Sequence, residues 1–353
     1  MPRVRLSPSA SVTPTPKGVL LRSDLGTFEI SGADVSTFLE AIVPLLDGSR
    51  DRDEIAGALE DFSHRSVLAL LALLETKGLV EAVPEEDATL HRRWRGQEDF
   101  FRKWSRSPEQ MARSLAESRV LLVGLSPWGA AAAGELAASG VGRIDVIDTG
   151  GAGEFDSSPH KEAFLKAMTE ASPWCRATVS PLAWPRGGEI DVDVGARRIA
   201  SAIVAGDRDP IQLVLGAAPG DQGSLLRSLA RLVHTMGVVS LYGDLDAASG
   251  LLGPVVVPGK TACWSCAQDL HLGRRPAPGS GDGFTPSSTM ASLLGQLLAL
   301  EAIKLITGYT DSGLVGRTRE YDFVSLETTI FTASQAPGCK ICGLGEGSAQ
   351  PVR

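Results

Sequence analysis

The chain has 353 residues, of which 43% are hydrophobic and 22% charged, and its formal net charge is −8. This length and composition are typical of a globular protein with two or three domains. The acidic balance argues against a general nucleic-acid binder, which needs a basic surface to neutralise phosphates. The N-terminus lacks an apolar signal-peptide core and no run of about 18 apolar residues follows, so we expect a cytoplasmic protein with no membrane span.

Residues 1–85 have the pattern of a small separate module. Short β-like runs come first, helical apolar spacing follows, and a returning strand closes the module. The expected elements are strands at 4–6, 19–22 and 27–30, helices at about 35–46, 51–59 and 64–77, and a strand at 79–82. Strands, three helices and a strand in this order predict a winged helix-turn-helix.

A charged stretch at residues 86–118 predicts a linker that passes into a helix, and the pattern changes at Arg119. An apolar strand then ends in a glycine, an alanine-rich helix follows, and a second strand ends in an aspartate. A strand, a helix and a strand in this order predict a parallel βαβ unit. Residues 119–353 are therefore expected to form one Rossmann-like α/β domain with a mainly parallel sheet. Further strands are expected at 211–215, 238–242 and 253–257, helices at about 225–236 and 288–307, and antiparallel strands within 315–333.

The turn from Gly124 to Gly129 is glycine-rich but departs from a phosphate-binding turn. In G-x-G-x-x-G the second glycine lets backbone N–H groups approach phosphate oxygens. Ser126 stands in that position, Pro127 lacks an N–H group, and Trp128 adds bulk. The turn suits a strand-to-helix connection and predicts a poor nucleotide cradle. Asp148, at the end of the next strand, is either a ribose-binding carboxylate or an ordinary strand-end residue.

Two CxxC pairs give the most specific signal: Cys263 with Cys266, and Cys339 with Cys342. A spacing of two residues lets both thiolates of a pair reach one metal ion from a tight turn. Four sulfur ligands favour tetrahedral zinc in a closed structural site that has no open position for water. A redox CxxC and unpaired thiols are the alternatives, and the fifth cysteine, Cys175, is expected to be a buried thiol without a catalytic role.

With these motifs, residues 119–343 resemble the ThiF/MoeB/ubiquitin-activating superfamily. The resemblance rests on four stretches, at 120–144, 257–266, 298–305 and 339–343. It implies a ThiF/MoeB-type fold with a zinc knuckle, in which active members adenylate a peptide or protein C-terminus with Mg-ATP.

The chain departs from the pattern of active members at three places. The turn lacks its second glycine, and the metal-binding carboxylate position is Pro219, with Asp221 two residues later. The stretch 150–161 has no arginine to bind phosphates, although Lys161 retains one basic position. These departures predict that ATP is not bound, which would leave Gly124, Ser126, Gly129, Asp148 and Pro219 as remnants of a nucleotide site.

The N-terminal module resembles the RiPP recognition element, a winged-helix domain that binds the leader of a ribosomally made peptide. Its fusion to a degenerate ThiF-like domain is similar to the partner proteins of azoline and thiopeptide pathways, in which a YcaO-type cyclodehydratase does the ATP-dependent chemistry. The resemblance implies that the leader adds as a strand to a sheet edge beside the third helix. The groove residues expected on this basis are Val19, Leu20, Leu21 and Arg22 on the edge strand, and Arg65, Ser66, Leu70, Leu73 and Lys77 along the helix. The alternatives are core packing for the leucines and a solvated face for the charged residues, and the sequence leaves open which strand is the edge.

The sequence thus predicts a protein that is not an enzyme and that recruits a precursor peptide to a YcaO-type enzyme. The alternative is an active ATP-dependent adenylating enzyme acting on a peptide, with Asp148, Lys161 and Asp221 in relocated roles. A DNA-binding regulator that uses the winged helix is a third hypothesis, which the acidic charge disfavours. A homodimer through the sheet domain is a further expectation.

Overall fold

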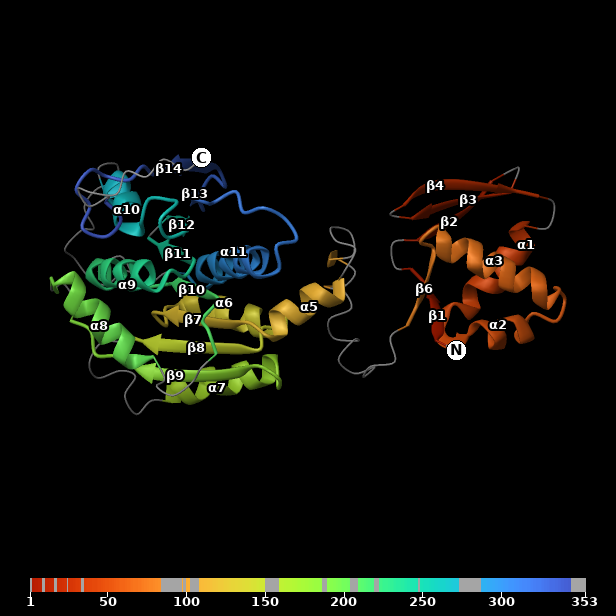
Figure 1. Ribbon diagram of the computed structural model, residues 1–353, viewed down its shortest axis with the longest axis horizontal. Helices are drawn as coiled ribbons and strands as arrows, with labels where there is room; N and C mark the ends of the chain where they lie inside the picture. The colour runs from red at the N-terminus through yellow and green to blue at the C-terminus, as the bar shows by residue number, and fades with distance from the viewer. Residues whose placement is uncertain are drawn as a thin grey trace. The chain divides into compact units, whose positions relative to one another are not determined.

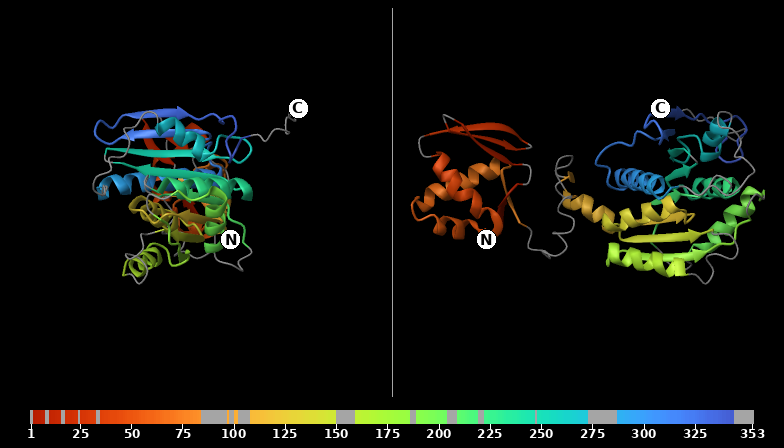
Figure 2. Two further views of the ribbon diagram at one scale, coloured as in Figure 1. Left: turned by 90° about the vertical axis from the view of Figure 1, so that its left-hand side faces the viewer. Right: turned by 180° about the vertical axis from the view of Figure 1, so that it is seen from behind.

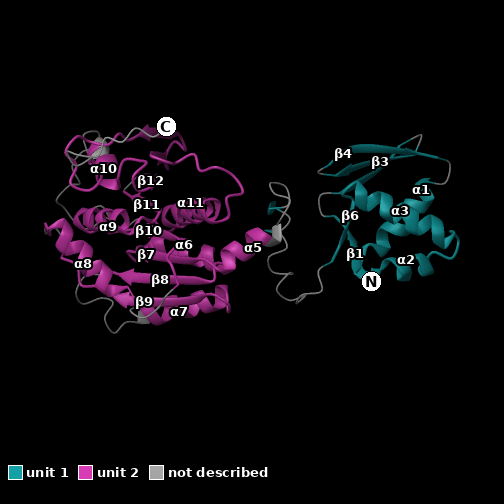
Figure 3. Cartoon of the chain, viewed as in Figure 1, with its two compact units in different colours: residues 1–108 teal, residues 109–353 magenta. Residues whose placement is uncertain are grey.

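The computed structural model forms two compact units, residues 1–108 and 109–353 (Figure 3), and each is described by itself. The residues that the structure describes are 2–7, 10–15, 18–23, 25–32, 35–83, 97, 100–101, 108–149, 159–185, 189–203, 209–218, 222–246, 248–272 and 287–343. The domain boundaries expected from the sequence, 1–85, 86–118 and 119–353, stay predictions.

The described elements of the first unit include two small antiparallel sheets, the α-helices α1, α2 and α3, and the short 3-10 helix η1. Its elements are β1 (Arg3–Leu6), β2 (Ser11–Thr15), β3 (Gly18–Ser23), β4 (Gly26–Ser31), α1 (Val35–Ile42), η1 (Val43–Leu45), β5 (Asp47–Asp51), α2 (Arg52–Ala58), α3 (His64–Thr76) and β6 (Val80–Ala82). The strand orders are β2-β3-β4 and β5-β1-β6. One apolar core, which includes Ile42, Ile55 and Leu71, holds the sheets and helices together. The winged helix-turn-helix stays a prediction.

The position of β3 corrects one expectation. Residues 19–22 were expected on a free sheet edge, but β3 is hydrogen-bonded on both sides, to β2 and to β4. Val19 and Leu21 are buried in the core of the unit. The outer strands of this sheet are β2 and β4, so an added strand would have to pair with one of these.

An eight-stranded sheet forms the centre of the second unit. Its strands are β7 (Arg119–Val123), β8 (Arg143–Asp148), β9 (Arg176–Pro181), β10 (Leu213–Gly216), β11 (Ser240–Leu245), β12 (Ser249–Val256), β13 (Arg317–Asp322) and β14 (Thr328–Thr332). The order is β14-β13-β12-β11-β10-β7-β8-β9, which Figure 1 shows from top to bottom. The five strands from β11 to β9 are parallel and β12, β13 and β14 are antiparallel. The predicted parallel βαβ unit and mainly parallel sheet are confirmed.

Helices cover both faces of this sheet, as the side and back views show (Figure 2). They are α5 (Pro108–Ala116), α6 (Pro127–Ala138), α7 (Pro159–Ala171), α8 (Val192–Ala202), α9 (Gly223–Met236), α10 (Trp264–Leu272) and α11 (Ser288–Thr307). α6 contacts α7 and α11, whereas α9 contacts α8 and α10. This division follows from right-handed crossovers, because the chain steps outward from β7 in one direction and then returns to add β10 and β11 on the other side.

α11 is the one helix in the described ranges that is long and apolar enough to cross a membrane by those two criteria. Its residues Ala291, Leu294, Leu298 and Ala302 are buried, and the helix packs along α6. This packing is that of a core helix in a folded domain.

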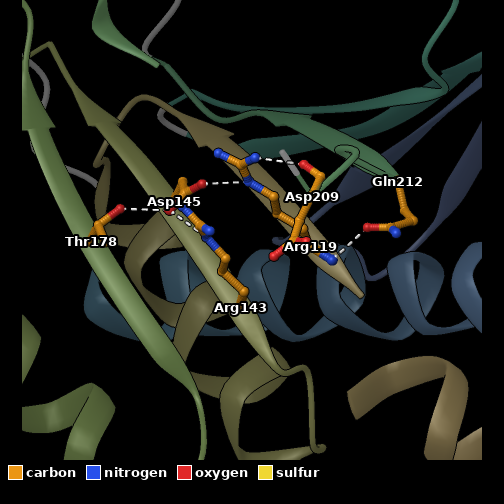
Figure 4. A network of polar contacts seen from close by, with 6 residues as sticks. All are labelled: Arg119, Arg143, Asp145, Thr178, Asp209 and Gln212. Carbon is orange, nitrogen blue, oxygen red and sulfur yellow. Dashed lines mark hydrogen bonds and ion pairs between the residues drawn. The ribbon is translucent and has the colours of Figure 1, made fainter. Parts of the chain in front are cut away.

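A buried polar network joins the amino-terminal ends of β7 and β8 to the neighbouring strand β9 (Figure 4). The Asp145 carboxylate accepts hydrogen bonds from Arg119 Nε at 2.7 Å, Arg143 Nε at 3.1 Å and Thr178 Oγ1 at 2.6 Å. Burial by itself raises the pKa of Asp145, but these hydrogen bonds outweigh it and lower the pKa below its ordinary value. The network lies at the sheet edge opposite the carboxyl ends of the parallel strands, so we assign it to stability.

Candidate functional site

The carboxyl ends of β7 and β10 mark the point where the strand order reverses in the second unit. Open parallel sheets bind ligands in the crevice at such a switch point. Gly124 follows β7, and Ala217 and Ala218 follow β10, so these residues form the floor of the candidate site. The backbones at Gly124 and Ala217 approach closely, and a Cβ on Gly124 would lie only 2.6 Å from the Ala217 carbonyl oxygen.

The Gly124–Gly129 turn is tight, and its residues Ser126 and Pro127 form the start of helix α6. Gly124 has φ +96°, and a Cβ on Gly129 would lie 2.8 Å from the Gly124 carbonyl oxygen. Ser126 is the N-cap of α6, and its hydroxyl accepts the Gly129 N–H at 3.1 Å. Pro127 takes the first helical position, where an N–H has no intrahelical partner in any case.

Trp128 lies in the core rather than over the turn. Its side chain is 2% exposed, and its indole N–H donates to the Gly243 carbonyl oxygen at 3.1 Å. The bulk of Trp128 suggested from the sequence that this residue obstructs the turn. The structure shows that it does not, because the side chain lies in the core. The Ser126-Pro127-Trp128 segment is a stable helix start, and its departure from glycine does not by itself exclude a phosphate group at the N-terminus of α6.

Beside this turn the end of β8 presents three buried polar groups. Asp148 is the last residue of β8, and the neighbouring Thr149 hydroxyl donates to the Gln222 side-chain oxygen at 2.9 Å. All three residues are buried. Sequence reasoning missed Thr149 and Gln222, and only the positions of these residues, after β8 and directly before α9, could have pointed to them.

Two of the residues weighed in the sequence lie outside the described part of the chain. These are Pro219, which occupies the expected metal-carboxylate position, and Asp221. Lys161, the basic position retained in the stretch after Asp148, lies in the first turn of α7.

The four cysteines of the CxxC pairs come together at the start of α10 and in the turns after β14. The sulfur–sulfur distances are 3.8 Å for Cys263–Cys266, 3.7 Å for Cys263–Cys339 and 3.6 Å for Cys266–Cys342. Four thiolates at Zn–S bonds of about 2.3 Å around a tetrahedral ion are separated by about 3.8 Å. This cluster could therefore hold a metal ion such as zinc.

The surroundings of the cluster suit a bound cation. Backbone N–H groups donate to two of the sulfurs, from Cys263 to Cys342 at 3.5 Å and from Ala336 to Cys266 at 3.4 Å. Burial raises the pKa of the Cys266 thiol to about 11. Burial also raises the pKa of Cys263. Since buried thiolates need a compensating positive charge, the donor set fits a divalent metal ion.

The residues expected to bind a leader peptide lie in the first unit with unequal exposure. Arg22, Arg65, Ser66 and Leu73 are exposed, Leu20, Leu70 and Lys77 are half-buried, and Val19 and Leu21 are core residues. Lys77 reaches β4, where its ammonium group lies 4.7 Å from the centre of the Phe28 ring. The end of α3 and the outer strand β4 are thus adjacent, and the binding role of the whole set stays a prediction.

No protein-family model matches the chain. A curated relative named molybdopterin-synthase adenylyltransferase, from Salmonella typhimurium, is 24% identical over 248 residues, which cover 65% of this chain and 89% of the relative. A second relative, adenylyltransferase and sulfurtransferase MOCS3 from Oryza sativa subsp. japonica, is 28% identical over 238 residues, which cover 65% of this chain and 45% of the relative.

Solved structures match over a larger share of the chain. E. coli MccB has a TM-score of 0.60 at 14% identity, and the match covers 97% of this chain and 100% of MccB. PaaA has a TM-score of 0.63 at 14% identity, covering 93% and 99% of the two chains. MccB, a Microcin C7 biosynthetic enzyme, has also been solved with ATP and with N-formylated MccA.

These comparisons correct the expectation that the chain is not an enzyme. Both curated relatives are named adenylyltransferases, and the structural neighbours include MccB with ATP. They therefore point to an enzyme. One of the three departures behind that expectation does not hold in the structure, because Ser126 caps α6 and Trp128 packs in the core, so neither obstructs the turn. The chain has the fold of the ThiF/MoeB-like adenylyltransferases of the ubiquitin-activating type.

Proposed function

We propose that this chain is an ATP-dependent adenylating enzyme that acts on the carboxyl group of a peptide. In this reaction a carboxylate oxygen attacks the α-phosphorus of ATP, the bond to the β-phosphate oxygen breaks, and an acyl adenylate and pyrophosphate form. This is the alternative hypothesis from the sequence, and it replaces the non-catalytic role.

The observation that carries this proposal is a whole-chain fold match to a protein that has been solved with ATP, together with the tight turn and the strand-end carboxylate at the switch point of the sheet. The match to MccB with ATP covers 96% of this chain. At the switch point, the tight Gly124–Gly129 turn leads into the N-terminus of α6, and Asp148 ends the adjacent strand. A helix N-terminus favours phosphate oxygens, and a carboxylate at the end of the second strand is placed to bind ribose hydroxyls. We therefore propose that ATP binds there, contrary to the sequence-based expectation.

The cysteine cluster has a supporting role in this proposal. Zinc bound by Cys263, Cys266, Cys339 and Cys342 would have four protein ligands and no open position for a reacting group. Such an ion joins α10 to the segment after β14 and contributes stability rather than chemistry.

We further propose that the first unit binds the leader of a ribosomally made precursor peptide. MccB has been solved with MccA, and a peptide substrate needs a recognition surface apart from the reacting carboxylate. The outer strand β4 lies beside the end of α3, where Lys77 contacts the Phe28 ring, and Arg65 and Leu73 are exposed on the same helix. We propose that these elements bind the leader, because an outer strand can pair with an extended peptide and cationic side chains can attract acidic residues. Delivery to a YcaO-type enzyme stays a prediction that no observation favours.

Peptide-dependent exchange of labelled pyrophosphate into ATP tests the adenylation step. The probes are synthetic peptides encoded by short reading frames beside this chain's gene. We expect exchange that requires both Mg-ATP and one such peptide. Absence of exchange with every peptide, in protein that retains its fold, would refute the proposed function.

Asp148→Asn tests the site assignment. A hydrogen bond from a ribose hydroxyl to an ionised acceptor contributes about 1.5–3 kcal/mol, so the KM for ATP should rise by about 10-fold or more. Glu135→Gln, the same chemical change at an exposed position of α6, should leave that KM unchanged. Equal KM values for ATP in the two variants would show that Asp148 does not bind ATP.

A further inference from the structure

In the part of the chain that the structure describes, the outer strand β14 lacks three common protections of a sheet edge, namely a charged side chain, a proline and a bulge. Among the described residues it pairs with β13 alone. Its sequence, Thr-Thr-Ile-Phe-Thr, has no charged residue and no proline, and its pairing with β13 runs without a bulge. Natural proteins use lysine, proline or a bulge to stop an edge from accepting another strand. The edge of β14 is therefore competent to pair with an extended segment.

The hydrogen-bond register shows which groups of β14 face this edge. The Asp322 N–H donates to the Glu327 carbonyl at 3.0 Å, and the Ala333 N–H donates to the Gly316 carbonyl at 3.1 Å. Hydrogen-bonded and non-hydrogen-bonded pairs alternate along an antiparallel ladder. The backbone N–H and C=O groups that point away from β13 consequently belong to Thr328, Ile330 and Thr332.

The hairpin that joins β13 to β14 adds an exposed apolar tip. The side chains of Val324 and Leu326 are 78% and 77% exposed. The Asp322 carboxylate accepts the N–H groups of Val324 and Ser325 at 2.8 and 3.0 Å, and Leu326 is held at φ +62°. A leucine in this left-handed conformation is disfavoured and persists only where its surroundings hold it. The hydrogen bonds to Asp322 therefore hold the tip in a defined conformation.

This hairpin tip lies at the edge of the sheet where the parallel strands end, which is the edge that carries the candidate site. β13 is antiparallel to β12, which is antiparallel to β11, so β13 runs in the direction of the parallel strands. Its carboxyl end, where the tip begins, therefore lies at the same sheet edge as the Gly124 turn and Asp148. A strand that pairs with β14 in the antiparallel sense would leave the sheet with its C-terminal end at this edge.

We propose that β14 is the docking edge for the substrate peptide, just ahead of the carboxyl group that is adenylated. The peptide pairs antiparallel to β14 through Thr328, Ile330 and Thr332, and its next residues cross the Val324–Leu326 tip. The fit is to an extended, uncharged, β-branched or apolar segment, because Ile330 is exposed and the strand carries no charge. This inference rests on the proposed function and specifies how the substrate reaches the site.

The sheet geometry sets the length of peptide required. β14 and β10 are separated by four strand spacings. At about 4.8 Å per spacing the distance is about 19 Å, which an extended chain crosses in about six residues. Peptides with fewer than about six residues between the docked segment and the carboxylate should dock without being adenylated.

Ile330→Pro tests the docking edge in the full chain. Proline removes the N–H that points outward and is tolerated on an edge strand at such a position. We expect the peptide KM to rise on the order of tenfold, because one peptide carbonyl loses its partner, while the KM for ATP stays the same. Ile330→Ala, which keeps the N–H, should change the peptide KM less than Ile330→Pro. Equal peptide KM values for Ile330→Pro and the unchanged chain, with Tm maintained, would overturn the proposal.

Residue-level amide hydrogen exchange gives a readout that does not depend on adenylation. On addition of the same synthetic peptide, exchange should slow at Thr328, Ile330 and Thr332, and change little at Thr329 and Phe331, whose N–H groups already bond to β13. Unchanged rates at saturating peptide would overturn docking at β14 even where pyrophosphate exchange succeeds. Protection that rises with protein concentration in the absence of peptide would assign the edge to a second copy of this chain and equally overturn the proposal. Protection without pyrophosphate exchange would support docking and refute only the adenylation.

Discussion

Asp145 is the residue on which a buried cluster of charges depends. Its side chain is 4% exposed and forms ion pairs with Arg119 and Arg143, which are buried to a similar extent. Two guanidinium groups share one carboxylate, and Arg119 additionally donates to the Asp209 carbonyl. Removing one partner of a buried ion pair leaves uncompensated charge in the interior.

Asp145→Asn should therefore destabilise the protein strongly. The free energy of unfolding should fall by about 3–5 kcal/mol, the range found when one partner of a buried pair is removed. Urea unfolding measures this difference. Asp193→Asn removes a partly exposed pair with Arg231 and should change stability by less than about 1 kcal/mol. Similar effects of the two substitutions would show that the Asp145 cluster does not contribute as described.

The stability contributed by Asp145 should also depend on pH in a defined direction. Its folded pKa is lowered, so the folded state binds this proton less readily than the unfolded state, whose pKa is about 3.9. The contribution is fully present above that value and is lost as the pH falls through the folded pKa. The stability difference between the unchanged chain and Asp145→Asn should narrow below about pH 4. A difference that is constant from neutral to acidic pH would contradict this.

Substitutions of Ser126 test whether this residue caps α6 or obstructs ATP binding. As the N-cap of α6 it should lose about 1 kcal/mol of stability on replacement by alanine and only a few tenths on replacement by glycine. The KM for ATP should change by less than about twofold in Ser126→Gly, because the side chain is directed at Gly129 and not at the ligand. A large gain in ATP affinity in this glycine variant would restore the interpretation of Ser126 as a block.

At the scale of elements, the cysteine cluster should behave as one metal site. Cys339→Ser should abolish stoichiometric zinc, measured by elemental analysis, and lower the Tm by about 5 °C or more. Cys175→Ser, outside the cluster, should keep both the zinc content and the Tm within about 2 °C. Full zinc content in Cys339→Ser would mean that the four sulfurs do not form the site.

The elements that could be predicted from the sequence are those with a strong apolar pattern. The runs that form β7 and β8, and the long apolar spacing of α11, match the structure closely. β5 was missed because its sequence, Asp-Gly-Ser-Arg-Asp, is wholly polar and forms a strand only through pairing with β1. β9 was missed because it is only partly buried and shows no clear alternation.

Strand order was the second limit on prediction. The alternation of Val19 and Leu21 indicated a strand with one buried face, which is correct, but it carries no information about its neighbours. β2, which contains Pro14, did not read as a strand, so β3 was taken as an edge. Among the site residues, those with a short sequence motif could be predicted, whereas those brought together only by the fold could not. The CxxC spacing brought four cysteines together correctly, whereas Thr149 and Gln222, 73 positions apart, meet only through the fold.

At the scale of the whole molecule, the two units each have a core of their own. The core of the first unit includes Ile55, Val67 and Leu71, all fully buried. A fragment of residues 1–108 should therefore unfold cooperatively in urea, and Leu71→Ala should lower its stability by about 2–5 kcal/mol. Circular dichroism measures both. A fragment without a cooperative transition would mean that the first unit depends on the second for folding.

The central claim is that the second unit activates a peptide carboxylate with ATP at the switch point of its sheet. The most direct measurement is mass spectrometry of the peptide after incubation with the full chain and Mg-ATP, with hydroxylamine added to trap the activated carboxyl group. We predict a peptide hydroxamate that forms with the unchanged chain and Glu135→Gln, and that is strongly reduced with Asp148→Asn at ATP concentrations below its KM. Unmodified peptide in every reaction, from folded protein that binds the same peptide, would contradict the account.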